Sequence, residues 1–167
     1  MSEGTRSILL GTTGLWLAIG VALFLTLARG GVEGNAMQLR AAVRVAIVAV
    51  LLQGAHFAEE LTTGFHRRFP ELLGLEPWHV GFFISFNLFW LAIWGLSTWG
   101  LAARRWIALF PLWFLGIASV VNVLAHPLLS FRAGAYFPGL VSSLFVGIAG
   151  AVLLAHLVRA TDGRAGA

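Results

Sequence analysis

Cysteine and lysine are both absent from this chain, and charged residues of any kind are few. The 167 residues include no Cys, and only 11% of them are charged. Without cysteine there are no disulfides, no thiolate nucleophile and no cysteine-ligated zinc, and the redox compartment cannot be inferred. Any metal or catalytic site must therefore be built from histidine, carboxylate, amide and hydroxyl groups.

The low charge is matched by a high apolar content. Hydrophobic residues make up 59% of the chain, too many for a soluble core covered by polar surface. We predict an all-α, polytopic membrane helix bundle with about five transmembrane helices, which forms a single membrane domain over residues 1–167. The predicted helices cover residues 8–28, 41–63, 80–102, 106–126 and 138–158. We expect the last four to enclose any pocket, and the first to pack at the periphery.

The eleven basic residues are all arginines, and they lie near the ends of the apolar segments. This distribution is typical of topology signals and not of a nucleic-acid patch, so no nucleic-acid partner is expected. One side of the membrane receives four of them and the other side receives seven. Because arginine-rich loops stay in the cytoplasm, we predict that the N-terminus lies outside and the C-terminus inside.

Ionisable residues are rare inside membrane helices, yet the second predicted helix holds three. His56, Glu59 and Glu60 lie within one arc of about 100°, and His56 and Glu60 are the closest pair. Two adjacent carboxylates stay ionised at membrane depth only beside a metal ion, a protonated histidine or an arginine; otherwise one is protonated. The simpler alternative is that both glutamates reach the headgroup region. We favour a functional site on this face.

The fourth predicted helix carries a matching polar face. Ser119, Asn122 and His126 are spaced i, i+3 and i+7, although such groups also serve simply to bond a neighbouring helix. Pro127 is expected to end this helix. Because of the alternating chain direction, the polar residues of several helices should form one pocket in the outer leaflet. They are His56, Glu59, Glu60, Asn87, Asn122, His126 and Tyr136.

The segments that carry these residues look like a known motif. His56-Phe57-Ala58-Glu59-Glu60, followed by Asn122 and His126 and then by Tyr136-Phe137-Pro138-Gly139, resembles the HXXEE-domain family of small bacterial integral membrane proteins. The resemblance covers roughly residues 45–155 and leaves the first helix outside. It implies a multi-pass protein of the bacterial inner (plasma) membrane. It marks the site residues without supplying a reaction.

The residues predict a membrane-embedded metal-dependent enzyme. His56, Glu60 and His126 would ligate zinc or iron beside an open position. Glu59 would act as a general base or support a ligating histidine, and Asn122 would orient substrate or bound water. Tyr136 is a further catalytic candidate. A lipid-like substrate would enter from the leaflet for hydrolysis or another reaction, so the expected partners are membrane lipid and a hydrophobic small molecule. A homo-oligomer is compatible with the sequence.

Two other functions stay open. A metal-free isomerase or cyclase of a sterol-like or terpenoid-like lipid would use a protonated carboxyl of the Glu59/Glu60 pair as the acid. A histidine would be the base, and Trp90 or Trp94 would stabilise a developing cation. The protein would otherwise be a non-catalytic membrane protein that binds an ion or cofactor, or a transporter. The confinement of the polar residues to one leaflet argues against transport.

Overall fold

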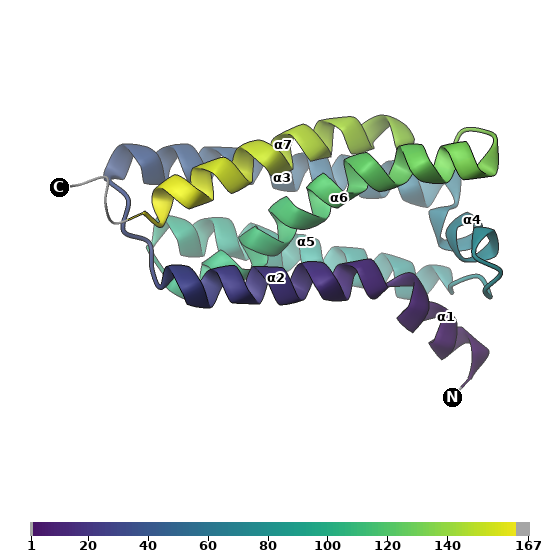
Figure 1. Ribbon diagram of the computed structural model, residues 1–167. Coiled ribbons are helices and arrows are strands. Elements are labelled where there is room, and N and C mark those ends of the chain that lie inside the picture. The colour runs from purple at the N-terminus through teal and green to yellow at the C-terminus, as the bar shows by residue number, and fades with distance from the viewer. Residues whose placement is uncertain (1, 163–167) are drawn as a thin grey trace.

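The computed structural model describes residues 2–162, and within that range every regular element is a helix. The predicted all-α class is therefore confirmed. Figure 1 shows the long helices running alongside one another, with α1 and α4 at one end of the bundle and the end of α7 at the other. The elements are α1 (Glu3–Gly11), α2 (Thr13–Arg29), α3 (Ala36–Thr63), α4 (Phe65–Leu72), α5 (Val80–Ala102), the 3-10 turn η1 (Trp106–Ala108), α6 (Leu109–Ala133) and α7 (Leu140–Ala160).

Four of these segments are long and apolar enough to cross a membrane: α3, α5, η1 with α6, and α7. A fifth candidate is the pair α1 and α2, which is bent by 49° where the two helices meet. Large apolar side chains cover the outer surface, and Phe131 on α6 is 89% exposed. Such a surface is stable against lipid and not against water.

Helix α3 corresponds to the second predicted helix, 41–63, but it begins five residues earlier, at Ala36, because of a capping box. The Asn35 side chain accepts hydrogen bonds from the backbone N–H groups of Met37 and Gln38, each at 3.0 Å. Gln38 Oε1 in turn accepts from the Asn35 backbone N–H at 2.8 Å. At the other end Gly64, with φ of 81°, terminates the helix after Thr63, as predicted.

The prediction that Pro127 ends the fourth membrane helix is wrong. Helix α6 runs through Pro127 to Ala133, and Gly134 ends it in the left-handed conformation with φ of 64°. Packing within a helix bundle tolerates the missing N–H of proline at membrane depth. As a result His126 lies seven residues before the end of α6, and His56 lies seven residues before the end of α3. Both histidines are therefore about 10 Å inside the same end of the bundle.

Small residues bring α6 and α7 close together. A β-carbon added at Gly150 would stand 2.5 Å from Cβ of Ser119, and Gly147 faces Val123 with equally little room. Ser119 therefore faces α7 and takes part in helix packing, which is the simpler alternative to a role in the site.

The segment between α3 and α5 ties the first helix to the bundle. Trp78, in the connection after α4, is buried, and its Nε1 donates to Ser7 Oγ at 3.1 Å. The Ser7 hydroxyl donates in turn to the backbone oxygen of Glu76 at 2.6 Å. These bonds hold α1 against the α4 region, at the end of the bundle where the polar residues gather.

Candidate functional site

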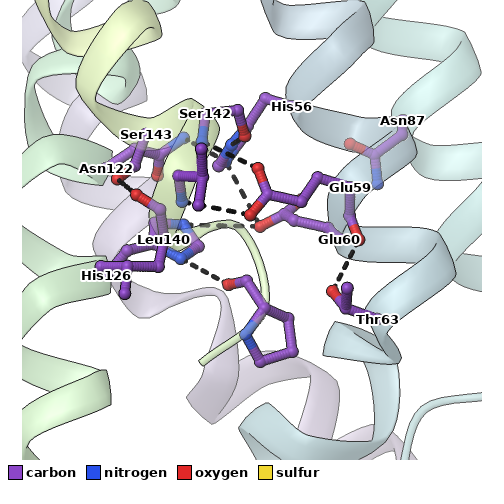
Figure 2. A network of polar contacts seen from close by, with 12 residues as sticks. His56, Glu59, Glu60, Thr63, Asn87, Asn122, His126, Leu140, Ser142 and Ser143 are labelled. Carbon is purple, nitrogen blue, oxygen red and sulfur yellow. Dashed lines mark hydrogen bonds and ion pairs between the residues drawn. The ribbon is translucent and has the colours of Figure 1, made fainter. Parts of the chain in front are cut away.

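Three buried ionisable side chains meet between α3 and α6. His56 and Glu60 are one turn apart on α3, and His126 comes from α6. Glu60 Oε1 lies 3.4 Å from Nε2 of His56 and 3.5 Å from Nε2 of His126. Figure 2 shows the three side chains pointing toward one another, and the imidazole rings meet edge to face with their centroids 4.9 Å apart. Glu60 is thus the bridge between the histidines, as its position on the helix predicted.

Each histidine is fixed through its other ring nitrogen. His126 Nδ1 is 2.7 Å from the backbone oxygen of Pro138, which can only accept, so Nδ1 carries a proton. His56 Nδ1 is 2.7 Å from Ser142 Oγ. This arrangement orients both Nε2 atoms toward Glu60. It is the outer hydrogen bonding that metal-ligating histidines use to fix the ring and its tautomer.

Because His126 is protonated at Nδ1, its neutral form presents a lone pair to the Glu60 carboxylate. Two electron-rich nitrogens and a carboxylate oxygen then converge, which is stable only with a cation between them, either a proton or a metal ion. The candidate ligand atoms all lie within 4.8 Å of one another. In a tetrahedral zinc site with bonds of about 2.0–2.1 Å, neighbouring ligand atoms are about 3.3–3.4 Å apart, close to both distances from Glu60. The group can therefore hold a metal ion.

Asn122 lies beside this group on α6. Its amide Nδ2 is 3.3 Å from His56 Nε2. A His56 ring protonated at Nδ1 satisfies both of its contacts, since it donates to Ser142 Oγ and accepts from Asn122. Asn122 also lines the cavity described below, so its amide faces both a candidate ligand and the space where a substrate would lie.

Glu59 points to the other side of α3, where it caps α7. Its carboxylate accepts from the backbone N–H of Val141 at 3.1 Å and of Ser142 at 2.8 Å. Helix α7 has no capping side chain of its own at Gly139, so Glu59 supplies the acceptor that its first turn lacks. Because Ser142 also contacts His56, Glu59 is connected to the histidine group through that serine.

Tyr136, in the connection between α6 and α7, joins the same cap. Its hydroxyl donates to Glu59 Oε1 at 2.6 Å. Burial raises the pKa of Tyr136, and the hydrogen bond and negative charge of Glu59 raise it further. The phenol is therefore held as a neutral donor to the Glu59 carboxylate.

Gly139 and Ser142 are functional positions that the sequence reasoning missed. A β-carbon at Gly139 would lie 2.8 Å from His126 Nδ1 and 2.9 Å from His56 Cε1, so the start of α7 packs directly on both imidazoles. Gly139 also has φ of 83°, which favours glycine. In the sequence, Gly139 stood out only as the last residue of the Tyr136-Phe137-Pro138-Gly139 motif, and Ser142 did not stand out. The glycine was the one available signal of close packing.

A cavity of about 260 Å³ opens beside the His–Glu–His group. Glu60, His126 and Asn122 form part of its polar lining, whereas His56 is fully buried behind them. Its other walls are mostly aromatic. They include Phe82, Phe83, Phe86, Trp90, Trp94 and Phe114. Such a space accepts an apolar molecule and presents one end of it to the ionisable residues.

The first helix pair also lines this cavity, through Gly11, Thr12, Gly14 and Leu15. The prediction that the last four helices would enclose the pocket, with this helix at the periphery, is therefore wrong, and no described residue of α7 lines the cavity. The bend between α1 and α2 falls at Thr12, whose hydroxyl bonds the carbonyl of Ile8 at 2.7 Å, and this bend lies against the cavity. Asn87 lines the cavity too, as the shared end of the helices predicted.

Other polar candidates lie apart from the group. The Thr63 hydroxyl bonds the backbone oxygen of Glu59 at 2.6 Å, and His79 caps the first turn of α5. His66 is on α4, where burial and the charge of Arg67 lower its pKa. None of these residues, nor His156 on α7, belongs to the candidate metal group found within residues 2–162.

The fold and the site together define a membrane-type helical bundle with a buried His–Glu–His group that can hold a metal ion. No protein-family model, curated protein or solved structure matches the chain. The resemblance to the HXXEE-domain family therefore stays a prediction from the motif residues.

Proposed function

We propose that this protein is a membrane-embedded metal-dependent enzyme that acts on a lipid-like or hydrophobic substrate. One observation carries the proposal: a single carboxylate oxygen of Glu60 lies within 3.5 Å of the Nε2 atoms of two imidazoles, each of which is held in place through its Nδ1 atom. His56, Glu60 and His126 would hold zinc or iron, a set of two histidines and one carboxylate that leaves a coordination position for water or substrate.

The neighbouring residues suit supporting roles in that site. Asn122, which faces the cavity, would orient the substrate or a metal-bound water. Of the two roles open to Glu59, the contacts through Ser142 favour support of a ligating histidine over direct proton transfer, because its carboxylate is occupied by the first turn of α7 and by Tyr136. Tyr136 would then act on the site only through Glu59.

The aromatic cavity supports a hydrophobic substrate. Its ionisable residues, Glu60 and His126, lie where the metal would be bound, so a metal-activated water could attack a polar group at that end of a mostly apolar molecule. The resemblance to the HXXEE-domain family would place this chemistry in the inner (plasma) membrane of a bacterium, and the predicted topology would place the site in the outer leaflet.

Metal analysis of the purified, untagged protein tests the proposal. We expect about one zinc or iron per chain in the wild type, and loss of most of it in His126→Gln and His56→Gln, because each removes one of three ligands. His156→Gln on α7 is the matched control and should keep the wild-type content. Wild-type protein without stoichiometric metal after supply of zinc and of anaerobic ferrous iron would overturn the proposal.

A metal-free acid–base enzyme is the second candidate, because aromatic rings line the same cavity as Glu60. Trp90 and Trp94 contact each other and Phe114, with the Trp90 and Phe114 centroids 4.6 Å apart. These rings would stabilise a carbocation by cation–π attraction. Activity retained by fully metal-free protein would favour this alternative. The third candidate function is the binding of an ion or cofactor without catalysis.

A further inference from the structure

The buried stripe of α3 changes character at Gln53. Toward the start of the helix the stripe is made of alanines that pack against neighbouring helices. These are Ala42, Ala46 and Ala49. The next buried position is Gln53, whose large amide side chain is only 8% exposed. A packing seam would have continued with another small residue, so the glutamine needs a separate explanation.

The Gln53 amide lines the cavity and has no hydrogen-bond partner within residues 2–162. The other two amides on the cavity wall are engaged. Asn87 Nδ2 donates to the Phe83 backbone oxygen at 2.9 Å, and Asn122 Nδ2 contacts His56 Nε2 at 3.3 Å. A buried amide without a partner is unfavourable at membrane depth, and its polar atoms face a space large enough for a ligand.

Gln53 and Glu60 lie at two levels of the same cavity. Seven helical residues separate them, which corresponds to about 10 Å along the axis and nearly two full turns, so both project from one face of α3. Most of the other side chains that line the cavity are aromatic. The cavity therefore presents hydrogen-bonding groups at two levels, Gln53 at one and Glu60 at the other, in a mostly aromatic wall that also includes Asn87 and Asn122.

We infer that the ligand of this cavity is an elongated hydrophobic molecule with a hydrogen-bonding group toward each end, and that Gln53 binds the second of these groups. The group is an uncharged hydroxyl or carbonyl, because an amide both donates and accepts but carries no charge. The inference rests on the proposed function in one respect, since it takes the Glu60 and His126 end to be where the first polar group is bound.

A matched pair of probes tests the role of Gln53. The two oxygens of a fully extended ten-carbon α,ω-diol are about 14 Å apart, enough to reach both levels, whereas the ten-carbon primary alcohol has one polar end only. The affinity ratio of diol to alcohol is measured in lipid nanodiscs for wild type and for Gln53→Met, which keeps a similar side-chain volume. Comparing the two ratios cancels the partition of each probe into the lipid. Leu51→Met, at a 69% exposed position of α3 that does not line the cavity, is the control.

We expect the diol-to-alcohol ratio to be about fivefold higher in wild type than in Gln53→Met, the factor that one hydrogen bond typically contributes. Leu51→Met should match wild type. Equal ratios in wild type and Gln53→Met, or no binding of either probe, would overturn the inference and show that the amide is satisfied by water alone. Metal content is measured on the same samples. Its absence would overturn the proposed function and leave the ratio as a separate result.

Discussion

Gly139 and His126 leave no room between them for a methyl group. A β-carbon at position 139 would lie 2.8 Å from Nδ1 of His126, the atom that donates to the Pro138 backbone oxygen. We expect Gly139→Ala to displace the imidazole and to lower zinc affinity by about ten- to a hundredfold, the usual effect of disturbing the hydrogen bonding behind a ligand. Competition with a zinc chelator measures it.

Gly134→Ala is the control for that substitution. Gly134 also has a positive φ, 64°, but a β-carbon there meets no atom within 4 Å. Both variants should lose about 1–2 kcal/mol of stability from the left-handed backbone. Only Gly139→Ala should lose zinc affinity. Similar zinc affinities in the two variants would show that the contact with the histidines has no consequence for the site.

The adjacent glutamates should respond differently to the same substitution. Glu60→Gln removes the charge that lies between the two imidazoles, so we expect most of the bound metal to be lost. Glu59→Gln should keep the metal and lower stability by about 1 kcal/mol, because α7 loses a charged acceptor at its N-terminal turn. Metal analysis and thermal unfolding distinguish them. Full metal retention by Glu60→Gln would contradict the assignment.

The single tyrosine of the chain allows a direct measurement of the Glu59 contact. Burial and the Glu59 carboxylate raise the pKa of Tyr136, so the folded state favours the neutral phenol. Its stabilising contribution is complete below the ordinary pKa of about 10 and is lost as the pH rises from there through the folded pKa.

Ultraviolet absorbance of the ionised phenol should therefore show Tyr136 titrating above pH 10 in wild type. In Glu59→Gln the pKa should fall back toward the ordinary value, because the negative charge is gone while the burial remains. Glu71→Gln removes an exposed carboxylate of α4 and serves as the control. An unchanged titration in Glu59→Gln would show that the hydrogen bond does not form in the membrane.

The absence of cysteine makes the topology directly testable. Single cysteines in place of Ser2 and Glu76 should react with a membrane-impermeant maleimide in intact cells, because both sites are on the side with fewer arginines. A cysteine in place of Asp162, beyond the end of α7, should react only after the membrane is permeabilised. The reverse pattern would place the N-terminus in the cytoplasm and the candidate site in the inner leaflet.

Local signals in the sequence were sufficient for the helical class and for most helix limits. The predicted helix 80–102 coincides with α5, because its apolar run and its flanks leave no competing choice. The predicted end of the fourth membrane helix was wrong because a local signal conflicted with later residues and with helix packing. Pro127 favours a helix end, but the glycine at 134 and the packing of α6 on α7 carry the helix seven residues further than predicted.

For the site, the sequence by itself determined which side chains share a helix face, because helical periodicity fixes directions around an axis. His56 and Glu60 were paired in this way, and the common end of the helices brought His126 and Asn122 to the same level. Helical periodicity also paired Glu60, and not the adjacent Glu59, with His56, but only the tertiary structure decided what each carboxylate contacts. One points toward α6 and the histidines and the other toward the first turn of α7. That difference depends on how the neighbouring helices are placed around α3. Glu59 and its partners on α7 are more than 80 residues apart in the sequence, and no local pattern encodes close packing between such distant segments.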